Sequence, residues 1–155
     1  MSVRVAHSKS SKDDNDLSKL QREGWITADG VLTSDHDAAQ VQWGGDWRMP
    51  TQQEMYDLAI KCDWTETTQN GVNGYVVRGR GAYASNSIFL PCVGLGHGTS
   101  LYSAGSYGHY WSSVPSSGYD YYAWGLGFDS SILSASYYGY RADGQPIRPV
   151  QGVAK

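Results

Sequence analysis

The sequence predicts an α+β fold with one or two short helices, many short strands and long irregular loops. The chain of 155 residues is the size of a single domain, so one domain is expected over residues 1–155. Only one segment, which begins at Thr51, has a clear helical pattern of apolar residues. Beyond it, short apolar stretches alternate with Gly and Ser, as in short strands joined by turns. Few helices and many short strands together favour the α+β class.

The first third of the chain predicts a mobile lead-in, a short helix and a hairpin. Residues 1–16 are expected to be mobile, because the stretch from Ser8 to Asp16 is polar and charged. A short helix is expected from Asp16 to a stop at Gly24. Residues 25–27 and 31–33 are β-formers that flank an Asp-Gly pair, which is typical of a tight hairpin turn.

The segment from Thr51 predicts the clearest helix. Thr51 and Glu54 have the spacing of a capping box, in which each side chain bonds to the backbone N–H of the other residue. Apolar residues then recur at helical spacing, so the helix is expected to end near Lys61.

Alternating patterns predict the strands that follow. The Asn-Gly pairs at 70–71 and 73–74 predict turns that lead into strands at 75–77 and 87–90. Later, large apolar residues occupy every second position of one stretch, which predicts a strand with a core face and an open face. The inward residues would be Trp124, Leu126 and Phe128, and the outward residues Gly125, Gly127 and Asp129.

The stretch from Val93 to Tyr140 has an unusual composition. Its 48 residues carry only two charged side chains, Asp120 and Asp129, and nine of the protein's twelve tyrosines. Tyr offers a large rigid contact area with one polar tip, and Ser and Gly add adaptable hydrogen bonds, as in antibody paratopes. The composition therefore indicates a recognition surface, with ordinary irregular β structure as the alternative.

Charge and hydropathy exclude two classes of partner. The net charge is −3 and the basic residues are scattered, so no nucleic-acid partner is expected. No apolar run approaches the roughly 20 residues of a membrane-spanning helix, so no membrane insertion is expected.

Cys62 and Cys92 fit no zinc pattern, and they permit either one disulfide or two free thiols. The triplet Asp35-His36-Asp37 predicts a solvated turn rather than a metal site, because three adjacent side chains do not readily face one point.

Four short sequence motifs resemble those of a known family. They are Trp43-Gly-Gly-Asp-Trp-Arg-Met-Pro-Thr51, Asn86-Ser-Ile-Phe-Leu-Pro91, Tyr110-Trp-Ser-Ser113 and Ile147-Arg-Pro-Val150. In this order and rough spacing, from residue 37 to Gly152, they resemble the Fibrobacter succinogenes major paralogous domain family. That resemblance implies a C-type-lectin-like fold. It also gives Arg48, Arg141 and Arg148 a default role in stabilising the scaffold, with ligand binding as the alternative.

Domains similar to this family serve as the variable proteins of diversity-generating retroelements, in which adenine-directed mutagenesis rewrites codons near the C-terminus. An Asn codon altered at its adenines yields mostly Tyr, Ser, Asp, Gly, His and Ala, and these residues crowd the span 102–143, which contains no Asn. The resemblance therefore implies a variable ligand-binding region at 97–143. The ligand-binding residues expected within it are Tyr102, Tyr107, His109, Tyr119, Asp120, Tyr121, Tyr122, Tyr137, Tyr138 and Tyr140.

The function expected from these patterns is binding of a macromolecule, a protein or glycan on a cell or phage surface, by a protein that is not an enzyme. No catalytic residue, metal or cofactor is expected. The cell surface or a phage particle is the favoured location, although the N-terminus lacks the apolar region of a secretory signal. One alternative is a non-variable structural or adhesion domain of a bacterial surface protein. A remote alternative is an oxidase similar to formylglycine-generating enzymes, which also use paired cysteines, but the motifs around those cysteines do not occur here.

Overall fold

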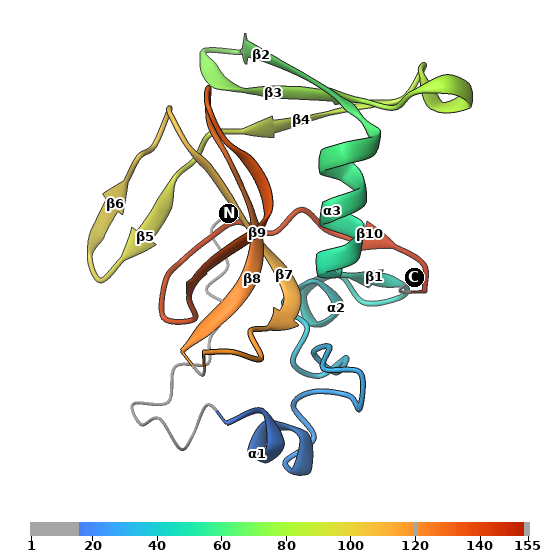
Figure 1. Ribbon diagram of the computed structural model, residues 1–155, viewed down its shortest axis with the longest axis vertical. Helices are drawn as coiled ribbons and strands as arrows, with labels where there is room; N and C mark the ends of the chain where they lie inside the picture. Colours follow the sequence, from blue (N-terminus) through green and yellow to red (C-terminus); the bar gives the residue numbers. More distant parts are fainter. Residues whose placement is uncertain (1–15, 120, 154–155) are drawn as a thin grey trace.

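The fold is mostly β and differs from the predicted class. The computed structural model describes residues 16–119 and 121–153, of which strands take 41% and helices 18%. The strands form several small antiparallel sheets (Figure 1), so the prediction of an α+β, C-type-lectin-like fold is wrong. The predicted lead-in at 1–16 lies outside the described residues except for Asp16. None of the helices in the described ranges has the length and apolarity that crossing a membrane requires.

The helices are all short, and the strands are short and numerous. The helices are α1 (Leu17–Arg22), α2 (Ala38–Trp43), α3 (Gln52–Lys61) and a 3-10 turn at Gly81–Tyr83. The strands are β1 (Trp47–Arg48), β2 (Asp63–Gln69), β3 (Val72–Arg78), β4 (Ser87–Pro91), β5 (Leu95–His97), β6 (Ser100–Tyr102), β7 (Gly108–Pro115), β8 (Tyr122–Phe128), β9 (Leu133–Tyr140) and β10 (Val150–Gln151). They pair as β1-β10, β2-β3-β4, β5-β6 and β7-β8-β9.

Local sequence signals placed the early elements well. Helix α1 begins after Asp16, whose carboxylate accepts a hydrogen bond from the backbone N–H of Ser18. The predicted hairpin is present in minimal form, as an antiparallel bridge between Ile26 and Leu32. Helix α3 has the predicted capping box between Thr51 and Glu54 and ends at Lys61 as expected.

The two Asn-Gly pairs behave differently. Asn70 and Gly71 both have positive φ, 50° and 78°, which is the geometry of a tight turn between antiparallel strands, and they connect β2 to β3 as predicted. The turn predicted at Asn73-Gly74 is wrong, because both residues lie inside β3. Gly74 is needed there for a different reason: a Cβ atom would lie 2.6 Å from the ring of Phe89 on β4.

The buried carboxylate of Asp37 corrects a further expectation. Asp37 is only 4% exposed, whereas a solvated turn was predicted. Its side chain caps α2 by accepting from the backbone N–H groups of Ala39 and Gln40. It also accepts from the N–H of Met49, at 2.8 Å, just after β1. The carboxylate therefore connects α2 to β1, and its full set of donors explains why it can be buried.

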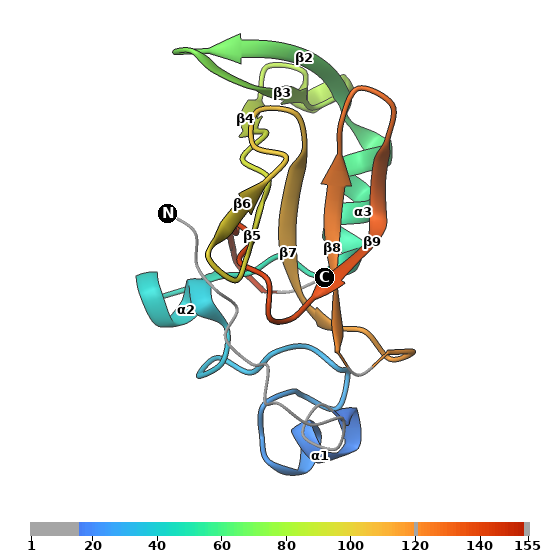
Figure 2. The same cartoon turned by 90° about the vertical axis from the view of Figure 1, so that its left-hand side faces the viewer.

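Sheet β7-β8-β9 is the centre of the molecule and is covered on both faces. Helix α3 and the sheet β2-β3-β4 pack on one face, where Leu126 and Phe128 are each 1% exposed in the main core (Figure 2). Trp111 lies on the opposite face, fully buried in a second core with Ala39, Met49 and Ala123. The predicted open face of β8 is therefore wrong, since Gly125 and Gly127 are buried too.

Aromatic rings pack directly against the glycines of this sheet and shield them from solvent. A Cβ atom at Gly127 would lie 3.0 Å from the Tyr137 side chain, and a Cβ atom at Gly108 would overlap the ring of Phe128. At Gly139 a Cβ atom would lie 3.0 Å from the ring of Trp111. The many glycines of this region thus make room for rings that lie across the strands.

Arg48, on β1, contacts both α3 and the segment after β10. Its guanidinium forms a two-pronged ion pair with Glu54, with both N–O distances 2.6 Å. The same group donates to the carbonyl oxygens of Gly152, at 2.6 Å, and Val153, at 2.9 Å. Arg48 therefore holds the segment after β10 against β1 and the first turn of α3. The default scaffold role expected for this arginine is consistent with these contacts.

We predict that Arg48→Lys destabilises the fold by about 1–3 kcal/mol, because lysine cannot make the paired hydrogen bonds to Glu54 while also reaching the carbonyl oxygens. The measurement is the free energy of unfolding in denaturant. Arg22→Lys, on the last turn of α1, is the matched control and should change it by less than about 0.5 kcal/mol. Equal stability of both variants would show that Arg48 does not hold the segment after β10 against β1 and α3.

Candidate functional site

Five aromatic side chains form one cluster at the end of sheet β7-β8-β9. The directly opposite pairs Tyr122–Tyr140 and Trp124–Tyr138 belong to β8 and β9. Their ring centroids lie 4.6 Å and 5.9 Å apart, and Tyr119, in the loop before β8, stacks on Tyr138 at 5.9 Å. We call these five residues the tyrosine face.

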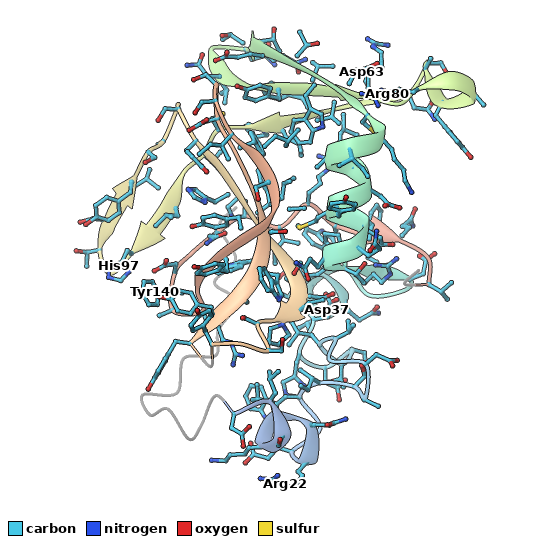
Figure 3. The ribbon with its side chains drawn as sticks, in the orientation of Figure 1. Arg22, Asp37, Asp63, Arg80, His97 and Tyr140 are labelled. Carbon is cyan, nitrogen blue, oxygen red and sulfur yellow. The ribbon has the colours of Figure 1, made fainter. Side chains whose placement is uncertain are left out.

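The tyrosine face is exposed because α3 stops short of it. Side chains alternate along β8, so Tyr122 and Trp124 point to the same side as Leu126. Helix α3 covers the Leu126 end, whereas Figure 3 shows Tyr140 at the opposite end of the strands, away from α3. The exposed fractions are large for aromatic residues: 60% for Tyr119, 45% for Tyr138 and 50% for Tyr140.

The hydroxyl group of Tyr122 is held in its neutral form. A side-chain hydrogen bond with Tyr140 raises the pKa of Tyr122 to about 12, and partial burial adds to the increase. The face offers aromatic rings, which gain from burial, and hydroxyls that both donate and accept hydrogen bonds. Tyr121, which is 42% exposed, lies beside it in the same loop.

Three of the residues predicted to bind ligand form a separate and more buried stack. The ring of His109 lies between those of Tyr107, at 4.2 Å, and Tyr137, at 4.6 Å. His109 is 6% exposed, and burial lowers its pKa to about 4, although the nearby carboxylate of Asp143 acts in the opposite direction. Burial also raises the pKa of Tyr137 to about 12. The stack is therefore separate from the tyrosine face and more buried than it, with His109 buried and the two flanking tyrosines partly exposed.

Of the two remaining predicted residues, the structure describes Tyr102. Tyr102 is 51% exposed on β6, which pairs only with β5. Asp120 lies outside the described residues. The structure thus brings together Tyr119, Tyr122, Tyr138 and Tyr140, with Tyr121 next to them, and separates Tyr102, Tyr107, His109 and Tyr137 from them.

Trp124 is the one member of the face that the sequence did not suggest. Alternation along β8 assigned it to the core with Leu126 and Phe128, but it is only partly buried and packs edge-on against Tyr138. The alternation of apolar residues along β8 predicts on which face of the sheet a side chain lies. It does not predict how far a helix covers that face. The aromatic residue opposite Trp124, Tyr138, could have indicated that Trp124 belongs to the face, but only if the register of β8 and β9 had been known.

The geometry gives little support to catalysis by a cysteine thiol or to metal binding. Cys62 and Cys92 are free thiols, and burial first, with Glu66 and Asp129 adding to it, raises the pKa of Cys92. A nucleophilic thiol requires a change of pKa in the opposite direction. In the part of the chain that the structure describes, no three His, Cys, Asp or Glu side chains come close enough to hold a metal ion.

The buried His109 predicts loss of stability in acid. Its pKa in the folded protein, about 4, is below the ordinary 6.5, so between these values the unfolded chain binds the proton more readily. The contribution of about 3 kcal/mol is present above pH 6.5 and is lost as the pH falls toward 4. We expect the free energy of unfolding to fall less steeply over this range in His109→Gln than in the wild type. Parallel pH profiles would show that His109 is not held neutral by burial.

Comparison with known proteins identifies a family but no characterised relative. Comparison with curated proteins and with solved structures found no match. The sequence model of a family described as "Domain of unknown function (DUF8237)" matches residues 63–150, more than half of the chain. The matched span begins with β2 and includes both the tyrosine face and the buried stack. The chain belongs to the DUF8237 family.

Proposed function

We propose that this protein recognises a macromolecule, a protein or a glycan on a cell or phage surface, through its tyrosine face, and that it is not an enzyme. The observation that carries this proposal is the cluster of exposed rings formed by Tyr119, Tyr138 and Tyr140 around Tyr122 and Trp124. Large exposed aromatic clusters are uncommon on soluble proteins and mark interaction sites. Tyr and Trp are also the residues that carry most of the binding energy at interfaces.

The geometry of the face reduces the entropic cost of binding. Each ring already contacts at least one other ring of the cluster, so its rotamer is restricted before a partner arrives. Ordering a free side chain at an interface costs roughly 0.5–1.5 kcal/mol, and the rings of the face avoid part of this cost. The strand pairing beneath them fixes the positions of Tyr122, Trp124, Tyr138 and Tyr140 relative to one another.

The chemistry of the face favours contact by rings and hydroxyls over long-range attraction. Asp120 and Asp129 are the only charged residues between Val93 and Tyr140. Steering by opposite charges is therefore weak, and binding depends on buried ring area and hydrogen bonds. Such binding is expected to change little with salt concentration.

The residue types of the face support diversification by a retroelement as the origin of its specificity. The exposed positions 119, 121, 138 and 140 all carry Tyr, one of the residues that adenine substitution produces from an Asn codon. Among the buried positions of the same sheet, Trp111, Leu126 and Phe128 are of other types, whereas His109 and Tyr110 are of types that adenine substitution also yields. Variation confined to exposed positions would alter the partner without disturbing the core.

Recognition through the tyrosine face predicts that Tyr119→Ala/Tyr138→Ala loses at least about tenfold in binding, because two ring contacts near the centre of the interface are removed. The measurement is flow cytometry of fluorescently labelled protein on a panel of bacterial cells. Protease and periodate treatment of the cells distinguishes a protein partner from a glycan.

The matched control is Tyr56→Ala/Tyr83→Ala, which removes two tyrosines that are 47% and 69% exposed but lie on α3 and on the 3-10 turn. It should bind as the wild type does. Equal binding by both double variants would contradict recognition through the tyrosine face and would favour a structural role for the domain.

Diversification by a retroelement predicts a reverse transcriptase gene and a near-copy of the 3′ end of this gene in the adjacent DNA. Differences between the copies should fall at adenines, within codons 97–143. Sequencing the locus checks this. Absence of both elements would contradict the retroelement origin while leaving binding by the tyrosine face as a separate question.

A further inference from the structure

A second candidate site is a groove that shares no residue with the tyrosine face. It lies between β4, the hairpin β5-β6 and the segment 144–148, and has a volume of about 530 Å³. Figure 2 shows this hairpin standing beside β7, on the side away from α3. Small-molecule sites have volumes of about 300–1,000 Å³, so the groove is of the right size for one. Its walls are mainly apolar and include Phe89, Val93, Leu95, Leu101 and Ile147.

Backbone contacts hold the walls of the groove in place. Gly96 of β5 and Gly144 exchange two hydrogen bonds, each 2.7 Å long, which fix the hairpin to the closing segment. Gly94, before β5, has φ 68°, and a Cβ atom there would overlap the carbonyl oxygen of Tyr102. The close approach of the two arms of the hairpin therefore requires glycine at position 94. A groove held in this way is formed before a ligand binds.

Arg148 is the one charged residue among those that line the groove. Two other arginines have acidic partners, since Arg48 pairs with Glu54 and Arg80 pairs with Asp63 at 2.7 Å. Arg78 instead donates a hydrogen bond to the carbonyl oxygen of Ala84. Arg148 is exposed, and within residues 16–119 and 121–153 it forms no salt bridge. Its positive charge is thus available to a ligand.

The surroundings of Arg148 place this charge next to the apolar walls. Tyr110 also lines the groove, and its hydroxyl donates a 2.9 Å hydrogen bond to the carbonyl oxygen of Pro91. Burial raises the pKa of Tyr110, and the charge of Arg148 works against this increase, so the two groups are near each other. A ligand whose apolar part contacts Leu95 and Leu101 could therefore also reach the guanidinium.

We propose that this groove binds a small amphipathic carboxylate, with its apolar body against the walls and its carboxylate on Arg148. A guanidinium matches a carboxylate with two parallel hydrogen bonds, and the apolar walls gain from covering a hydrocarbon body. All fourteen lining residues fall within the span that the DUF8237 family shares, residues 63–150. The site does not depend on the function of the tyrosine face.

Binding of octanoate to the full chain, followed by NMR chemical shifts of the backbone amides, tests this site. We expect saturable binding with a Kd of about 0.1–1 mM and shifts centred on residues 93–101 and 144–148. Octanol, which has the same chain length without the charge, should bind at least about tenfold more weakly. Octanol that binds as tightly as octanoate, or no saturable shift in these residues, would overturn the proposal.

Two variants separate the roles of charge and apolar wall. Arg148→Gln should weaken octanoate binding at least about tenfold, and Leu101→Ser, at a residue 66% exposed, should weaken it several-fold without loss of fold. Arg22→Gln makes the same change of charge on α1, which Figure 3 shows at the far end of the molecule, and should leave binding unchanged. Thermal unfolding confirms that each variant is folded. Folded Arg148→Gln that binds octanoate as the wild type does would overturn the site.

Discussion

The three-stranded antiparallel sheet β7-β8-β9 has to bury its apolar side chains against other elements to be stable in water, and this constraint organises the whole molecule. One face receives α3 and the sheet β2-β3-β4 over Leu126 and Phe128. The other face holds Trp111, in a second core with Met49. Glycines on all three strands let rings lie flat across the sheet where larger residues would collide with them. The tyrosine face occupies the part of the sheet beyond α3, where the rings pack on one another and Tyr119 of the preceding loop stacks on Tyr138.

The same constraint explains why the two groups of aromatic residues differ in chemistry. The ring of His109 lies between two tyrosines on the Trp111 side of the sheet, where burial keeps the imidazole neutral. Tyr119, Tyr138 and Tyr140 lie at the open end of the other side, where their hydroxyls meet water. Both groups come from one Tyr-rich stretch of sequence, but the sheet places one group in the scaffold and the other at the surface.

Local signals in the sequence were sufficient for several elements and failed where long-range packing decides. The capping box at Thr51, the Asp-Gly hairpin and the Asn70-Gly71 turn are set by residues within a few positions of one another. By contrast, Gly125 and Gly127 look solvent-exposed in an alternating pattern, yet residues distant along the chain cover them. The exposure of each tyrosine also depends on the register of β8 against β9, which shifts between Gly125 and Gly127, and on where α3 ends. The predicted fold class failed for a similar reason, because motifs in sequence order do not specify how small sheets are arranged in space.

Nitration of tyrosines by tetranitromethane, read by mass spectrometry with and without bound target cells, tests the central claim most directly. Recognition through the tyrosine face predicts that bound cells protect Tyr119, Tyr138 and Tyr140 from nitration. Tyr56 and Tyr83, which are comparably exposed on other elements, should be nitrated equally in both states. Protection of Tyr56 or Tyr83 with unchanged nitration of the tyrosine face would show that the partner binds elsewhere on the protein.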